Sequence, residues 1–104
     1  MMGFRLASQR VMARAARELT SGRSTGFISL GSSMAPSLKV VQRVSLRPVR
    51  PGESLVGQIS LAEVGGRFWL HRVSNERDGA AHIVADNGMV NGWTPRTAVF
   101  GVLV

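Results

Sequence analysis

Apolar and basic positions follow a helical period over residues 4–19, "FRLASQRVMARAAREL". At 100° per residue, one side of such a helix carries Phe4, Val11, Ala15 and Leu19, and the opposite side carries Arg10, Arg14 and Arg17. Gly22 is a plausible stop for the helix. The pattern therefore predicts an amphipathic, basic helix within residues 1–22.

After Gly22 the pattern changes to short runs rich in β-branched and apolar residues. Turn-forming segments such as "RPG", "VGG", "NERDG" and "NG" separate these runs, and "VGGRFWLHRV" suggests a hairpin. The sequence predicts a mainly β protein, in which residues 23–104 form one compact antiparallel β-domain. The expected strands are residues 26–30, 40–49, 54–61, 67–73, 81–86 and 98–104.

Charge adds a possible role for the helix. The chain of 104 residues carries 13 basic and 6 acidic residues, which gives a net charge of +7. This balance favours contact with nucleic acid, anionic lipid or an acidic protein. The few aromatic residues do not interleave with the basic ones, which disfavours nucleic acid. The helix at 4–19 either docks on the domain with its arginines in solvent, or also contacts a membrane surface or a partner protein.

Cysteine is absent, which excludes a disulfide scaffold and thiolate metal sites. Two histidines eleven residues apart, among scattered acids, do not make a metal site, and no phosphate-binding loop is present, so no metal or cofactor is predicted. No apolar run approaches the roughly 20 residues that cross a bilayer, and no secretory signal is recognisable. These observations predict a cytoplasmic or peripherally membrane-associated protein, with an organellar transit peptide as the alternative for the N-terminus.

The segment "GSSMAPSL", residues 31–38, is the strongest candidate for chemistry. A serine nucleophile needs a base within hydrogen-bond reach and donors for an oxyanion. Ser33 lies in an expected loop before a strand, where backbone N–H groups are available as such donors. Taken alone, a serine in such a loop is expected to be a turn residue and not a nucleophile.

The segments around Ser33 and downstream of it resemble the type I signal peptidase family. "GSSMAPSL" is similar to the family's G-x-S-M-x-P-[ST]-L box, and related self-cleaving repressor proteases carry a shorter form. "RPVRPGESLVGQI", "FWLHRV", "VADNGMVNGW" and "AVFGVLV" resemble the later conserved segments, in the same order. The resemblance covers residues 27–104 and implies the coiled β-domain of these proteins.

The resemblance implies a role for several residues. Ser33 would be the nucleophile, and His71 would be its base, as in the histidine-type branch of endoplasmic-reticulum and archaeal enzymes. A histidine accepts a proton at neutral pH without the desolvation that a lysine base needs. The backbone N–H of Ser33, aided by Ser32, would bind the oxyanion, while Met34 and Pro36 would shape the loop and the cleft wall.

The sequence leaves two alternatives for the third catalytic group. Asp86 in "VADNG" either orients His71 or holds the "DNG" turn by bonds to the backbone. Histidine-type relatives usually carry another aspartate a few residues later, where this chain has Asn91 and Gly92. The site would therefore be a Ser-His pair or include Asp86.

Several other residues receive structural interpretations. Lys39 and His82 are expected at the surface, and Arg72 on the opposite face of its strand from His71. Trp69 and Trp93 are expected in the core or in the cleft wall.

The expected function is that of a serine endopeptidase that cleaves an extended leader or signal-like segment of a peptide or protein substrate. One alternative is a peptide-binding module with the same fold and no catalysis. The other is a basic adaptor for a membrane surface or nucleic acid, working through residues 4–19.

Overall fold

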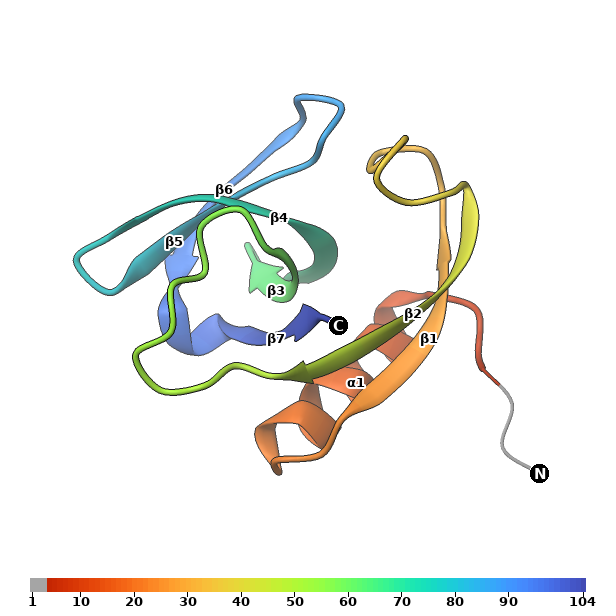
Figure 1. The fold of residues 1–104 in the computed structure, drawn as a ribbon, viewed down its shortest axis with the longest axis horizontal. Coiled ribbons are helices and arrows are strands. Elements are labelled where there is room, and N and C mark those ends of the chain that lie inside the picture. The colour runs from red at the N-terminus through yellow and green to blue at the C-terminus, as the bar shows by residue number, and fades with distance from the viewer. Residues whose placement is uncertain (1–3) are drawn as a thin grey trace.

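The computed structural model of the protein describes residues 4–104, in which one helix packs against a single curled sheet of seven strands (Figure 1). All neighbouring strands pair antiparallel, in the order β1-β2-β7-β3-β4-β5-β6. The mainly β class with one helix is therefore confirmed. The elements in chain order are α1 (Gln9–Thr20), β1 (Thr25–Leu30), β2 (Val41–Pro48), β3 (Ile59–Val64), β4 (Arg67–Arg77), β5 (Ala80–Val84), β6 (Val90–Pro95), a short 3₁₀ turn η1 (Arg96–Ala98) and β7 (Val99–Leu103).

The helix begins five residues later than the sequence pattern predicts. Ser8 is its N-cap, because the Ser8 hydroxyl accepts a hydrogen bond from the Val11 N–H at 3.1 Å. Residues 4–7 are not helical, and Leu6 bridges to Ile28 of β1 instead. The predicted bounds of 4–19 are therefore wrong at the N-terminal end. Residues 1–3 of the predicted segment 1–22 lie outside the described residues.

Helix α1 belongs to the same core as the sheet. Its buried residues Ala15, Ala16 and Leu19 join a hydrophobic cluster with residues of β1, β2, β3 and β4. At Gly101 of β7, an added Cβ would lie 2.7 Å from a Leu19 methyl carbon, so this glycine permits the close approach of helix and strand. The arginines of the opposite face, Arg10, Arg14 and Arg17, are exposed.

The sequence predicts six of the seven observed strands and omits β6. The expected strand at 54–61 is observed at Ile59–Val64, and residues 54–58 form the loop before it. The hairpin expected at "VGGRFWLHRV" is confirmed, with its turn at Gly65 and Gly66 between β3 and β4. Strand β6 is missing from the prediction, because its sequence "VNGWTP" contains the residues that usually mark turns.

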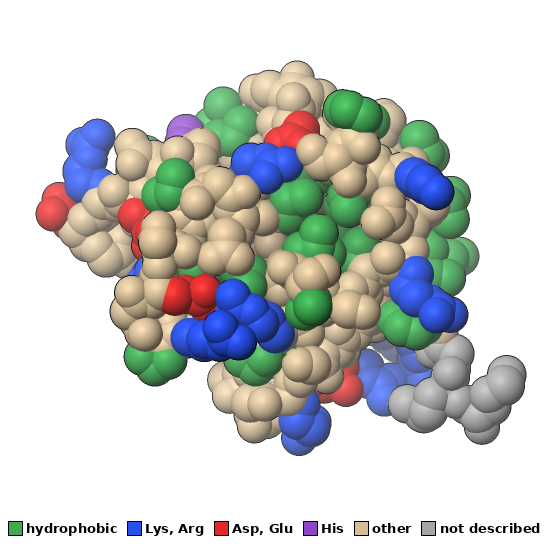
Figure 2. All heavy atoms as spheres, viewed as in Figure 1, with side chains coloured by type: hydrophobic (Ala, Val, Ile, Leu, Met, Phe, Trp, Pro, Cys, Tyr) green, Lys and Arg blue, Asp and Glu red, His purple; other side chains and the backbone are tan. Residues whose placement is uncertain are grey.

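The curled sheet encloses hydrophobic side chains on both of its faces. One cluster lies under α1, and a second one includes Leu55, Val73 and Ile83. Figure 2 shows hydrophobic side chains reaching the surface in the middle of the face, between the β1–β2 loop and the β5–β6 hairpin. Within residues 4–104, no helix has the length and apolarity needed to cross a membrane.

Candidate active site

Ser33 lies in the loop between β1 and β2, residues 31–40. This loop is fixed at two points: the Ser33 carbonyl accepts from the Asn87 N–H at 3.0 Å, and the Asp86 N–H donates to the Met34 sulfur at 3.3 Å. Met34 is 4 % exposed and anchors the loop in the core. Among residues 4–104, no acceptor pairs with the Ser33 N–H. The half-buried serine therefore stands beside a free backbone donor, which is the arrangement that an oxyanion requires.

His71 brings its imidazole to this hydroxyl from β4. Its Nε2 lies 3.1 Å from the Ser33 Oγ, although 38 residues separate the two in sequence. The ring is 4 % exposed and stacks on Trp69, with centroids 5.4 Å apart. His71 lies one residue before the first pair of the β4–β5 ladder, Arg72 with Val84, so β5 does not pair with β4 at this position.

Asn91 supports the other side of the His71 ring. The Asn91 Oδ1 lies 2.6 Å from the His71 Nδ1. An amide oxygen can only accept, so Nδ1 carries the proton and Nε2 of the neutral ring is free to accept from Ser33. Ser33, His71 and Asn91 therefore form a hydrogen-bonded chain in which the hydroxyl proton points to a basic nitrogen.

A β-bulge gives Asn91 its position. In the β5–β6 ladder Ile83 pairs with Gly92 and Val84 pairs with Val90, so Asn91 is the extra residue between them. Bulges of this kind re-aim a side chain out of the regular alternation of the strand. Gly92, with φ of +119°, supplies the backbone conformation that accompanies the bulge.

Burial lowers the pKa of His71 from its usual 6.5. Desolvation of the ring is the largest cause, and the hydrogen bond to Asn91 and the charge of Asp86 oppose it. The imidazole is consequently neutral at pH 7, which is the state that a general base must have.

Asp86 does not bind the imidazole. Its carboxylate accepts two hydrogen bonds of 2.8 Å from the Arg72 guanidinium and one of 2.7 Å from the Ser37 hydroxyl. The Arg72 guanidinium, followed by the Ser37 hydroxyl, lowers the pKa of Asp86 to about 2. The "DNG" turn is held instead by the Asn87 Oδ1, which accepts from the Met89 N–H at 3.0 Å. Asp86 thus acts on His71 only by its charge, and the hydrogen-bonding role expected for it is filled by Asn91.

The other expected residues lie around this centre at different distances. Ser32 and Pro36 are exposed and do not line the cavity beside Ser33, whereas Met34 does. Lys39 is exposed, as predicted. Arg72 follows His71 in β4, so the alternation of the strand places the two side chains on opposite faces, and its guanidinium joins the loop at Ser37 to Asp86.

The two tryptophans differ. Trp69 lines the cavity, as expected. Trp93 is neither in the core nor in the cleft wall: it is 44 % exposed and packs on His82, with ring centroids 4.8 Å apart. His82 is consequently half-buried rather than fully at the surface.

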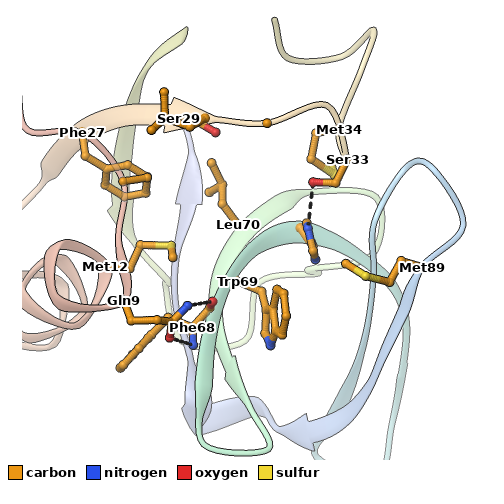
Figure 3. Close-up of a pocket in the computed structure, with 14 residues that line it drawn as sticks. Gln9, Met12, Phe27, Ser29, Ser33, Met34, Phe68, Trp69, Leu70 and Met89 are labelled. Carbon is orange, nitrogen blue, oxygen red and sulfur yellow. Dashed lines mark hydrogen bonds between the residues drawn. The ribbon is translucent and has the colours of Figure 1, made fainter. Parts of the chain in front are cut away.

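A cavity of about 200 Å³ opens next to Ser33 and His71 (Figure 3). It lies between β1 and the first half of β4, and α1 closes its far end. The lining combines apolar side chains, among them Met12, Phe27 and Leu70, with polar groups of Gln9, Ser29 and Ser33. A recess of this mixed character with one reactive pair at its rim suits a side chain of a bound peptide.

The described residues contain no group of three or more histidines and acids that could hold a metal ion. No family model, no curated protein and no solved structure matches this chain. The features that bear on function are therefore the hydrogen-bonded chain of Ser33, His71 and Asn91 and the cavity beside it.

Proposed function

We propose that the protein is a serine endopeptidase of the signal peptidase type, in which His71 activates Ser33 and Asn91 orients His71. The observation that carries this proposal is the chain of two hydrogen bonds, 3.1 Å and 2.6 Å long, through a buried imidazole. A nucleophile, a base and a group that orients the base are the parts that acyl transfer needs.

The reaction would begin when a peptide carbonyl lies over Ser33. His71 Nε2 takes the hydroxyl proton as Oγ attacks the carbonyl carbon, and the Ser33 N–H donates to the oxygen that becomes negative. Nε2 then gives the proton to the leaving amine, which breaks the C–N bond and leaves an ester on Ser33. Water then attacks this ester as Nε2 takes one of its protons, and Nε2 returns that proton to Ser33 Oγ as the C–O bond breaks and the acid product leaves.

Asn91 keeps Nδ1 protonated through each step, so Nε2 is always the nitrogen that exchanges protons. Its amide is neutral and cannot stabilise an imidazolium as a carboxylate does, but it fixes the tautomer. A neutral third group of this kind also serves cysteine peptidases of the Cys-His-Asn type. Asp86 contributes its negative charge from a distance, because Arg72 and Ser37 hold its oxygens.

The substrate would be an extended leader or signal-like segment of a peptide or protein. Such a segment can lie between β1 and β4 as an added strand, where main-chain pairing holds it and the cavity takes a side chain. The size of the cavity, about 200 Å³, allows one side chain next to the scissile bond to enter it.

Incubation of the protein with a mixture of leader-like peptides, followed by mass spectrometry, tests this proposal. We expect a single peptide bond to be cut in each accepted peptide, with a burst of the amine product before the steady state if deacylation is slow. The Ser33→Ala variant is the control. Equal cleavage by this variant and by the wild type would exclude Ser33 as the nucleophile.

A peptide-binding module without catalysis is the second candidate. The observation that favours it is the amide at position 91, because a histidine paired with an amide forms an imidazolium less readily than one paired with a carboxylate. In that case peptides would bind to the wild type and to Ser33→Ala with the same affinity, and neither protein would cut them.

The basic face of α1 supports an additional contact. Arg10, Arg14 and Arg17 are exposed and take part in none of the ion pairs found among residues 4–104. This face is suited to an anionic membrane surface near which a leader peptide would be cut. Co-sedimentation with vesicles of phosphatidylglycerol, lost in a variant with all three arginines changed to glutamine, would support this contact.

A further inference from the structure

The segment before α1 already occupies part of the edge of β1. Leu6 forms a parallel bridge with Ile28: the Ile28 N–H donates to the Arg5 carbonyl at 2.8 Å, and the Ala7 N–H donates to the Ile28 carbonyl at 2.7 Å. Residues 5–7 thus act as a short added strand, which runs in the same direction as β1, towards the loop that carries Ser33.

Gln9 closes the facing edge of β4 in a similar way. Its side-chain amide donates to the Phe68 carbonyl at 2.9 Å and accepts from the Phe68 N–H at 2.7 Å. Both backbone groups of Phe68 are therefore satisfied by one side chain, as they would be by a neighbouring strand (Figure 3). The two contacts close both edges at the end of the cavity that is remote from Ser33.

Nearer to Ser33 the two edges are open. The bond from the Gly31 N–H to the Val40 carbonyl sets the register of β1, so the backbone groups of Leu30 point away from β2. The bond from the Val73 N–H to the Gln58 carbonyl sets that of β4, so the groups of Leu70 point away from β3. Neither residue has another backbone partner within residues 4–104, and both line the cavity.

Phe4 anchors the segment at its start. Its ring packs on Gly26, where an added Cβ would lie 2.5 Å from a ring carbon, and the Arg43 guanidinium stacks on the ring at 4.1 Å. The segment from Phe4 to Gln9 is therefore held at both ends rather than lying loosely on the sheet.

We propose that this segment, residues 4–9, determines how much of the substrate is recognised upstream of the scissile bond. The inference rests on the proposed peptidase function and deepens it. In a parallel ladder, the N–H and C=O of one residue bond to two residues of the neighbouring strand that have one residue between them. Leu30 would pair with a substrate strand parallel to β1 in this way. The pairing would therefore cover about three substrate residues before the scissile bond. The next position towards the amino end is taken by the chain itself, at Ile28 and Phe68.

The test uses N-acetylated peptides that share one cleaved sequence and carry three, five or seven residues upstream of the scissile bond. For the wild type, we expect kcat/KM to change by less than about twofold between the shortest and the longest peptide, since added residues find no edge to pair with. In the Phe4→Ala/Gln9→Ala variant, the longest peptide should be preferred about tenfold, because the freed edges add main-chain hydrogen bonds.

Two further variants make the comparison secure. Gln9→Ala alone frees Phe68 without touching the anchor, and a smaller preference for the long peptide is expected from it. Arg23→Ala, an exposed arginine just beyond α1, is the control that should keep the wild-type length dependence. Amide hydrogen exchange reads the edges directly: the Phe68 N–H should exchange faster in Gln9→Ala, with exchange in the core strands unchanged.

The outcomes separate the two ideas. A wild-type kcat/KM that rises steadily with upstream length would overturn the role of residues 4–9 while leaving the peptidase in place. The same would follow if Phe68 exchanged faster in Gln9→Ala and the double variant showed no length preference. Failure of the wild type to cut any peptide would overturn the proposed function and this inference with it.

Discussion

Residues 4–104 contain two hydrogen-bonded pairs of serine and histidine, which differ more in their surroundings than in their distances. Ser33 Oγ lies 3.1 Å from His71 Nε2, and Ser74 Oγ lies 2.8 Å from His82 Nδ1. The shorter bond belongs to the pair whose serine is exposed to solvent. Distance alone would therefore favour Ser74 and His82.

The surroundings distinguish the two pairs. His71 is buried, its second nitrogen is held by Asn91, and a cavity opens next to it. Ser74 is exposed, its hydroxyl also lies 3.3 Å from the His82 carbonyl, and the His82 ring packs on Trp93. A hydroxyl that faces solvent and a ring without an orienting partner give a structural contact on the sheet surface. What makes a catalytic candidate is the oriented base together with space for a carbonyl.

Variants that remove each pair in turn test the difference between the two pairs, and they have the largest expected effect. Ser33→Ala and His71→Ala should each lower kcat/KM for a cleaved leader peptide by about a thousandfold or more, because the nucleophile or its base is lost. Ser74→Ala and His82→Ala are the matched controls, and they should stay within about twofold of the wild type. A large loss in the controls and none in the first two variants would reverse the assignment.

The second largest effect is expected at Asn91, which binds the second ring nitrogen of His71. Asn91→Ala should lower kcat/KM by about 10- to 100-fold, since one hydrogen bond to a ring that becomes charged contributes about 1.5–3 kcal/mol. Circular dichroism and thermal unfolding would check that the fold is kept. If kcat/KM is unchanged while the variant remains folded, the reaction does not use an oriented His71.

The pH dependence follows from the lowered pKa of His71. Its neutral form is the active base, so kcat/KM should rise with pH through a midpoint below 6.5 and stay level at neutral pH. Asn91→Asp places a carboxylate on Nδ1 and favours the imidazolium, so it should move this midpoint up by about one pH unit. A midpoint that stays in place, or moves down, would contradict the contact between residues 71 and 91.

The smallest expected effect concerns Asp86 and Arg72. Asp86→Asn removes a partly solvated ion pair and should lower the free energy of unfolding by about 1 kcal/mol, with a much smaller loss of kcat/KM than Asn91→Ala. Because the folded pKa of Asp86, about 2, lies below its unfolded value, the wild type has this stability in full above pH 4 and loses it as the pH falls through the folded value. Denaturation by urea at pH 7 and pH 2.5 measures the difference, which should be clearly smaller at the lower pH but not absent. A loss of activity comparable to that of His71→Ala would instead make Asp86 part of the catalytic machinery.

The local patterns of the chain predict much of the fold. The alternation of apolar residues indicates most strands, and the glycine pair at 65–66 indicates the hairpin between β3 and β4. The resemblance carried by "GSSMAPSL" and "FWLHRV" selects Ser33 and His71 in advance of any coordinates. The strand and hairpin predictions succeed because turn chemistry and the two-residue period of a strand are encoded locally.

Only the tertiary structure decides the rest. Strand β6 contains the turn-forming residues Asn91 and Gly92, and it is a strand because β5 lies beside it and a bulge absorbs the extra residue. That bulge turns Asn91 towards His71, while Arg72 draws Asp86 away from it. Likewise, residues 4–8 fit a helical period, but Arg5 and Ala7 form backbone hydrogen bonds with Ile28, and Ser8 caps the helix that follows. In each case the physical reason is the same: hydrogen-bond partners far along the chain outweigh a local preference of a few tenths of a kcal/mol to about 1 kcal/mol per residue.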